Sequence, residues 1–307
     1  MISGIFWPVF VFSAIALFVI GTAYRVLSLS RQPVHLRWEL SPIPHVKGRG
    51  SYGGSDFEEF EWWKGPRRRS LLAPLAYMAV EIFLLRSVFK NNKRLWPFSL
   101  GMHLGVYLII LTAPLYVAVA IILAGGMPSS DTNSLREVTY VLGVTGYLLG
   151  ISGVLGLLVL RSVVNDLRSF TSASGYFNLA FLGAVFLSGI NACLSLPDFT
   201  GTVGQYAKDL ITLDPTISIP FLLSLHVIIS ILFLIYLPWT NMSHFIAKYF
   251  TYHSVRWNDA PRDAKMDTEL RRLMGRPVSW SAGHVQADGD RSWIEIATEK
   301  ATDEKTP

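Results

Sequence analysis

The sequence has 307 residues, of which 51% are hydrophobic and only 16% are charged, and its mean hydropathy is +0.37. Soluble globular proteins are usually richer in charged residues, so this composition favours a membrane protein and argues against a soluble enzyme. A formal net charge of +5 would suggest nucleic-acid binding in a soluble chain. Here the basic residues lie beside apolar stretches, where membrane orientation explains them, and no nucleic-acid partner is expected.

Five apolar stretches are each long enough to cross a hydrocarbon core of about 30 Å as a helix. The first begins almost at Met1 without a basic n-region, so we expect it to remain as an anchor rather than to be cleaved as a signal peptide. The sequence therefore predicts an all-α integral membrane protein with a bundle of five transmembrane helices in membrane lipid. The stretches are residues 5–24, 97–123, 138–160, 176–196 and 217–240.

The charges between these stretches predict the orientation of the chain. Thirteen lysines and arginines lie from Arg25 to Arg94, whereas residues 124–137 and 197–216 each carry one basic residue. Basic residues concentrate in cytoplasmic loops. We therefore expect the N-terminus outside and the C-terminus in the cytoplasm, in the inner (cytoplasmic) membrane of a cell.

Residues 71–89 are apolar, but two features disfavour a sixth span. Glu81 and Arg86 would be costly at membrane depth, and Pro74 interrupts the pattern early. Basic residues flank the segment on both sides, so we expect an interfacial helix on the cytoplasmic surface. The expected divisions are a first transmembrane helix (1–28), a cytoplasmic loop with the interfacial helix (29–95), a four-helix membrane core (96–253) and a cytoplasmic tail (254–307).

Two features bear on partners. The polar tail contains Trp280 and Trp293 among mixed charges, and it either is disordered or docks onto a cytoplasmic partner. The single cysteine, Cys193, lies inside the fourth stretch, so the chain alone can form neither a disulfide nor a four-thiolate iron–sulfur site. Any such cluster would belong to a partner subunit.

Three of the seven histidines, His103, His226 and His244, fall within or at the ends of predicted spans. A histidine in a membrane bundle is costly unless it is satisfied, so each is a functional hypothesis. His226 and His244 are eighteen residues apart; on one continuous helix they would share a face and lie about 27 Å apart.

If the fifth helix continues to Lys248, His244 reaches the depth of His103 on the cytoplasmic side, while His226 lies too far outward to share the same partner. Haem iron takes axial imidazoles from two sides of the porphyrin, so His103 and His244 suit one haem iron. The alternative is a single interhelical hydrogen bond for each histidine.

Glycines surround this region. Gly101 and Gly105 bracket His103, and the third stretch carries a stripe of five further glycines at spacings of three or four. Such faces serve either close helix packing or a cofactor groove, and the pattern alone favours neither. The stripe comprises Gly143, Gly146, Gly150, Gly153 and Gly156.

Two segments resemble the cytochrome b (gamma) subunit of respiratory nitrate reductases and related membrane subunits of heterodisulfide-reductase-like menaquinol complexes. One is residues 224–244, SLHVIISILFLIYLPWTNMSH, with its two histidines eighteen positions apart and Pro238 six positions before the second. The other is residues 86–116, RSVFKNNKRLWPFSLGMHLGVYLIILTAPLY.

The resemblance implies two stacked haems b, each held by one histidine from the second span and one from the fifth. His103 and His244 would bind the haem iron nearer the cytoplasm, and His226 would bind the outer one. The family carries a second histidine ten residues after the first, but this chain has Ala113 there. His226 therefore ligates a second haem without an identified sixth ligand, donates to a quinone, or makes a structural hydrogen bond.

The resemblance also implies a function. Residues 96–253 would form the haem-binding core of a respiratory-complex subunit that transfers electrons between a quinone or menaquinol pool and a cytoplasmic iron–sulfur subunit. Such a chain is a non-autonomous part of an oxidoreductase. Asn191 and Tyr107 are polar candidates for the quinone site. Lys93, Arg94 and Arg161 either meet haem propionates or simply set the topology.

Two rival functions are weaker. A redox-inactive anchor or scaffold of a larger complex would account for the spans, the basic loop and the tail, but it leaves the three histidines unexplained. A transporter would usually show duplicated halves or paired broken helices, and none is evident in the sequence.

Overall fold

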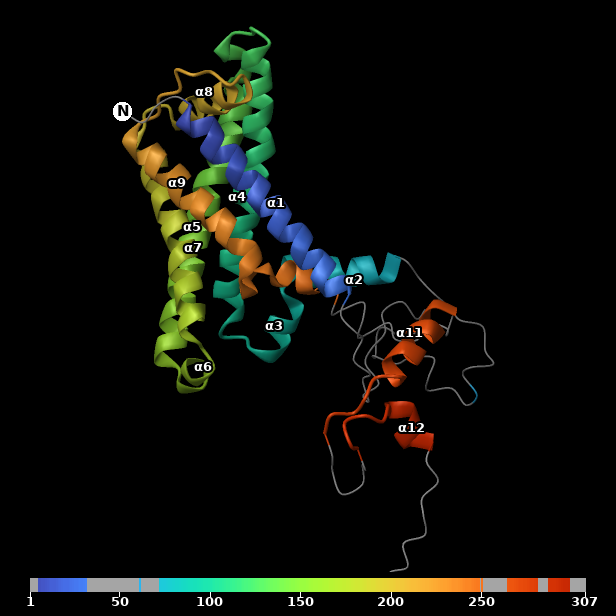
Figure 1. Cartoon of the computed structure of the whole chain (residues 1–307). Coiled ribbons are helices and arrows are strands. Elements are labelled where there is room, and N and C mark those ends of the chain that lie inside the picture. The colour runs from blue at the N-terminus through green and yellow to red at the C-terminus, as the bar shows by residue number, and fades with distance from the viewer. Residues whose placement is uncertain are drawn as a thin grey trace, which may run out of the picture. The chain divides into compact units, whose positions relative to one another are not determined.

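The computed structural model describes residues 5–31, 61, 72–248, 250, 264–280 and 287–298. Over these residues the secondary structure is helical apart from one isolated bridge, which confirms the all-α prediction. The chain divides into two compact units, Met1–Arg256 and Trp257–Pro307. The helices of the first unit are α1 (Phe6–Ser30), α2 (Leu72–Leu84), α3 (Arg86–Asn91), α4 (Trp96–Ala124), η3 (Ser129–Thr132), α5 (Asn133–Val163), α6 (Asn165–Ser169), α7 (Ala173–Ser195), α8 (Phe199–Ile211), α9 (Phe221–Tyr236), η4 (Leu237–Trp239) and η5 (Asn241–Ser243) (Figure 1).

Five helices in the described part of the chain are long and apolar enough to cross a membrane. They coincide with the five predicted stretches and extend several of them by a few residues, so the prediction of five spans is confirmed. In the bundle α5 lies between α4 and α7, α9 packs against α7, and α1 packs against α9 (Figure 1). The five are Phe6–Ser30, Trp96–Ala124, Ser129–Val163, Ala173–Ser195 and Phe221–Trp239.

The segment expected to lie at the interface does not form a sixth span. Helix α2 has 13 residues, which is about 20 Å of helix and too short for a hydrocarbon core of about 30 Å. It ends at Leu84, and the next residue, Leu85, has a left-handed φ of 47°, which interrupts the helix before α3 begins. The membrane-surface location of α2 stays a prediction.

Helix α8 lies in residues 197–216, between two of the spans, where the sequence predicted no helix. Asp198 caps it by accepting a hydrogen bond from the Gly201 backbone N–H at 3.0 Å, and it also pairs with Arg136 of α5. Tyr206 of α8 packs edge-on against Trp7 of α1, with ring centroids 5.9 Å apart. Buried residues of α8, such as Phe199 and Tyr206, thus pack against the bundle.

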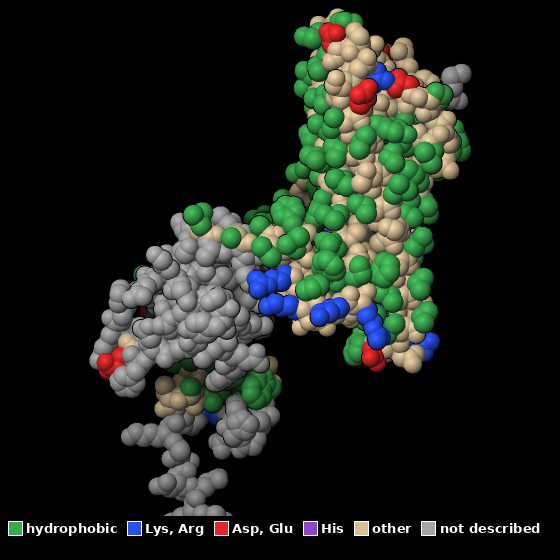
Figure 2. Space-filling model, turned by 180° about the vertical axis from the view of Figure 1, so that it is seen from behind, with side chains coloured by type: hydrophobic (Ala, Val, Ile, Leu, Met, Phe, Trp, Pro, Cys, Tyr) green, Lys and Arg blue, Asp and Glu red, His purple; other side chains and the backbone are tan. Residues whose placement is uncertain are grey.

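The charges of the bundle separate toward its two ends. Figure 2 shows lysine and arginine side chains gathered at the end where α3 and α6 lie in Figure 1, and acidic side chains gathered at the α8 end. The sides between them are largely hydrophobic. This asymmetry supports the predicted orientation, with the α3 end in the cytoplasm.

The glycine stripe serves close packing between α4 and α5. A Cβ atom added to Gly105 would lie 2.6 Å from the Gly146 carbonyl oxygen and 2.6 Å from the Gly150 backbone nitrogen. A Cβ added to Gly153 would overlap the backbone of Met102. Lipid tails remove the hydrophobic drive between helices, so such backbone approach is a main source of association. Helix packing is therefore found at Gly146, Gly150 and Gly153, whereas nothing lies within 4 Å of a Cβ at Gly143.

The second unit contains folded elements rather than a uniformly disordered tail. Helix α11 (Ala264–Met274) and helix α12 (Trp293–Thr298) are joined through an antiparallel bridge between Pro277 and Ser292. Val278 is 1% exposed beneath this bridge, and its backbone N–H donates to the Arg291 carbonyl at 2.9 Å. The described residues of the tail thus have a small core of their own.

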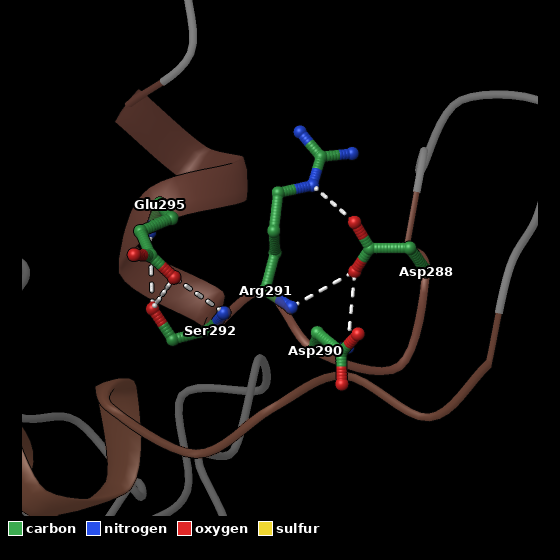
Figure 3. Close-up of polar contacts among 5 residues, drawn as sticks. All are labelled: Asp288, Asp290, Arg291, Ser292 and Glu295. Carbon is green, nitrogen blue, oxygen red and sulfur yellow. Dashed lines mark hydrogen bonds and ion pairs between the residues drawn. The ribbon is translucent and has the colours of Figure 1, made fainter.

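Two acidic side chains organise the turn that leads into α12 (Figure 3). Ser292 and Glu295 form a capping box: the Glu295 carboxylate accepts from the Ser292 hydroxyl at 2.7 Å and from its backbone N–H at 2.8 Å. Asp288 accepts from the backbone N–H groups of Arg291 and Asp290. These hydrogen bonds lower the pKa of both carboxyl groups.

We predict that alanine at Gly105 destabilises the bundle, whereas alanine at Gly143 does not. A methyl group at Gly105 meets only backbone atoms of α5, which cannot move aside, while nothing lies within 4 Å of a Cβ at Gly143. The expected cost is about 1–3 kcal/mol, the usual range for overpacking. Thermal unfolding in detergent measures it, and equal melting temperatures for the two variants would contradict the packing role.

We also predict that α12 loses amide protection when its capping box is broken. Because the folded pKa of Glu295 is lowered, its stabilisation is present above the unfolded pKa and is lost as pH falls through the folded pKa. Ser292→Ala should reduce hydrogen-exchange protection of residues 293–298 at neutral pH, and acidification should do the same to the wild type. Asp290→Ala, whose side chain is outside the box, is the control.

Candidate functional site

Two of the three membrane histidines lie side by side. His103 lies on α4, and His244 opens the helical residues 244–248 that follow η5. Their ring centroids are 6.2 Å apart and their planes meet at 73°. Residues that are 141 positions apart in the sequence thus form one imidazole pair.

The backbone between α9 and His244 follows a different path from the predicted one. Helix α9 ends at Tyr236, and the chain then makes two short 3₁₀ turns separated by Thr240, which is extended with φ −122° and ψ 173°. Pro238 has no N–H group and cannot continue an α-helical ladder. The expectation of one helix reaching Lys248, with two histidines on a common face, is therefore wrong.

The hydrogen bonding of His103 suits a metal ligand. Its Nδ1 lies 2.7 Å from the Ser99 carbonyl oxygen, and because a carbonyl can only accept, Nδ1 carries the proton. The other ring nitrogen, Nε2, then holds a lone pair. Ligating histidines usually donate their second N–H in this way, which fixes the ring orientation.

The separation of the pair also suits one metal ion. Metal–imidazole bonds of about 2.0–2.1 Å on either side of an ion, in line, place ring centroids about 6.3 Å apart. The observed 6.2 Å agrees with this. No group of three or more His, Cys, Asp or Glu side chains in the described part of the chain suits a metal, but haem iron needs only two axial protein ligands. The pair therefore fits haem iron better than a metal held by protein alone.

The two quinone candidates lie in different surroundings. The Tyr107 ring centroid is 6.2 Å from that of His103, and its hydroxyl donates to the Ile82 carbonyl of α2 at 3.0 Å. Asn191 is an exposed residue near the C-terminal end of α7, where it accepts from Ser195 at 3.4 Å. Tyr107 is the candidate that neighbours the imidazole pair.

His226 lies in a separate network of hydroxyl groups. Its Nε2 is 3.1 Å from the Tyr147 hydroxyl of α5, and its Nδ1 is 3.0 Å from the Ser188 hydroxyl of α7. Both ring nitrogens thus have protein partners on neighbouring helices. Ala113 offers no ligand atom. The residues around His226 therefore do not fit a second haem iron, and they match the structural hydrogen-bond alternative.

The basic residues proposed to meet propionates have local contacts. The Lys93 ammonium lies 5.8 Å from the centroid of the Phe89 ring. The Arg161 guanidinium donates to the Thr171 hydroxyl at 3.3 Å, which ties the end of α5 to the start of α7. Arg94 is exposed at the same end of the bundle. The Arg161 Nε is buried without a hydrogen-bond partner in the described part of the chain, so a propionate contact for Arg161 stays a prediction.

Sequence reasoning missed the contacts of two polar residues, Asn178 and Glu81, with the segment around the break after α9. Asn178 of α7 contacts both Tyr236 and Asn241, and Glu81 of α2 pairs with Lys248. Asn178 could have been singled out because it is a polar residue inside an apolar stretch of the sequence. Glu81 was noticed only as a cost of membrane insertion, because its partner is 167 residues away.

The chain is similar to known proteins over this region. A family model described as the nitrate reductase gamma subunit matches residues 80–258, which is more than half of the chain. A relative from Archaeoglobus fulgidus, named an Hdr-like menaquinol oxidoreductase cytochrome b-like subunit, is 26% identical over 212 residues. That match covers 62% of this chain and 58% of the relative, so the chain spans less than two thirds of its relative's length. No solved structure matches the chain significantly.

We predict that Tyr147→Phe destabilises the bundle without changing its helix content. Removing the hydroxyl leaves the His226 Nε2 unpartnered at a site where Tyr147 is only 5% exposed, and an unsatisfied buried polar group costs about 1–3 kcal/mol. Tyr24→Phe, at a position 60% exposed on α1, is the matched control. Thermal unfolding and circular dichroism in detergent measure both effects, and equal stability of the two variants would contradict the prediction.

Proposed function

The chain belongs to the nitrate reductase gamma subunit family, and from this premise we propose that it is a haem b subunit of a membrane respiratory complex. In this proposal the chain transfers electrons between a quinone pool and a cytoplasmic iron–sulfur partner. The observation that carries it is the imidazole pair: the ring centroids of His103 and His244 lie 6.2 Å apart, and Ser99 fixes the His103 tautomer. These two histidines would hold the haem iron.

The chain's own residues supply position and surroundings. When bound, the haem supplies a one-electron redox centre. His103 and His244 orient it between α4 and the segment that follows α9, and the neighbouring Tyr107 favours that side over Asn191 for the quinone contact. The name of the A. fulgidus relative supports menaquinol as the electron donor.

A partner subunit completes the reaction in this proposal. Cys193 is the single cysteine of the chain, so a cluster held by cysteine thiolates needs residues from another protein. The basic end of the bundle (Figure 2) is the cytoplasmic end under the positive-inside rule, and the histidine pair lies nearer that end, seven residues into α4. The partner would therefore accept electrons on the cytoplasmic side of the inner membrane.

The proposal includes a single haem per chain. His226 has Tyr147 and Ser188 as hydroxyl partners and has no matching axial ligand at Ala113. We assign it a structural role in joining α5, α7 and α9. This differs from the two-haem arrangement that the family resemblance implies.

We predict one b-type haem per chain in purified protein, lost in both His103→Ala and His244→Ala. His226→Ala should keep the haem and show lower thermal stability, because the buried Tyr147 hydroxyl loses its partner and the half-buried Ser188 hydroxyl loses one of its two. Reduced-minus-oxidised optical spectra with haem quantification measure the stoichiometry. A wild-type ratio of two, falling to one in His226→Ala, would restore the second haem. Folded wild-type protein without haem, expressed with ample haem supply, would favour the redox-inactive anchor.

A further inference from the structure

The segment that carries His244 is irregular, so its own backbone does little to fix its position. Between Tyr236 and His244 the chain passes through η4, an extended residue and η5. A continuous helix would place a side chain through its hydrogen-bond ladder, but Pro238 and Thr240 interrupt that ladder. Contacts with other helices must therefore determine where His244 lies.

The first such contact is a buried amide on α7. Asn178 is 7% exposed; its amide nitrogen donates to the Asn241 side-chain oxygen at 2.7 Å, and its own oxygen accepts from the Tyr236 hydroxyl at 2.7 Å. Tyr236 is the last residue of α9, and Asn241 opens η5. One side chain thus ties together the chain before and after the break.

The second contact is an ion pair with α2. The Lys248 ammonium lies 3.1 Å from one carboxylate oxygen of Glu81, whose other oxygen accepts from the Ser87 backbone N–H at 3.0 Å. Glu81 is 7% exposed, and a buried carboxylate is stable only when it is paired and hydrogen-bonded. Lys248 is one helical turn beyond His244. The ion pair with Glu81 therefore holds the C-terminal end of the segment that carries His244.

We propose that Asn178 and Glu81 are positioning residues that hold His244 opposite His103. This inference rests on the proposed haem-binding function. Neither side chain reaches the rings, and each acts through the segment between Tyr236 and Lys248. Fully satisfied buried polar networks select one arrangement over its alternatives. Together the two contacts set the 6.2 Å separation and the 73° angle of the imidazole planes.

Two substitutions with matched controls test this role. Asn178→Ala is paired with Asn165→Ala, an exposed asparagine of α6, and Glu81→Gln is paired with Asp166→Asn, an exposed acid at the same end of the bundle. The first readout is the rate at which haem passes to an excess of haem-free globin. Loss of groups that orient a metal ligand typically costs 10–100-fold in affinity, so we expect release about tenfold faster or more in Asn178→Ala and Glu81→Gln, and wild-type rates in the controls.

The second readout separates positioning from general stability. The g values of low-spin ferric haem depend on the angle between the axial imidazole planes, so the electron paramagnetic resonance spectrum should shift in Asn178→Ala and Glu81→Gln. The Lys248 side chain is 41% exposed, so a substitution there meets little steric resistance, but one that removes the charge leaves the buried Glu81 carboxylate without its ion pair. Lys248→Met should reproduce the shift and the faster release, and Lys248→Arg should restore wild-type behaviour.

The outcomes distinguish this inference from the function on which it rests. Wild-type protein that folds without haem would overturn the proposed function. Wild-type protein with haem, together with unchanged release rates and spectra in Asn178→Ala and Lys248→Met, would overturn the positioning role alone. If Glu81→Gln does not accumulate in membranes, the two Lys248 variants decide the ion-pair contribution.

Discussion

Backbone contact between α4 and α5 is the constraint on which the site depends. Lipid does not drive helices together, so the glycines that let Gly105 of α4 meet Gly146 and Gly150 of α5 set the position and rotation of α4. His103 lies two residues before Gly105, which is about 200° around a helix of 3.6 residues per turn. Packing the glycine face onto α5 therefore turns His103 away from it, toward α2 and the segment after α9. Gly101 and Gly105 thus orient His103 indirectly, because they fix the face of α4 that is opposite to it.

The break after α9 places His226 and His244 in different surroundings, which a straight helix would not do. A continuous fifth helix would place His226 and His244 on one face, each facing the same neighbours at different depths. The break separates them: His226 stays among hydroxyl groups of α5 and α7, and His244 turns to the ring of His103. Asn178 and Glu81 stabilise this redirected path at two points. The polar residues of the membrane core are thus concentrated where regular helix geometry ends.

The features predicted from sequence are those with a local signal. Hydropathy and length found the five spans of the described residues, and the segment that contains Glu81 and Arg86 is not among them. Helix α8 was missed because its apolar face is short and interleaved with polar residues. The break was missed although Pro238 is visible, because the direction of a chain after a proline depends on contacts with distant residues. The partners of His226 lie on two other helices, so no spacing in the sequence reveals them.

A single haem would constrain where quinol can exchange electrons with this chain. Electron transfer slows steeply with distance, and under this proposal no second iron relays electrons from the depth of His226. The quinone must then approach the pair formed by His103 and His244 itself. Tyr107 borders that pair, and its hydroxyl ties α4 to α2 beside Phe83, which is 55% exposed on the outside of the bundle. An apolar quinone arriving through lipid would meet this side, between α2 and α4, without crossing the glycine contact that closes α4 against α5.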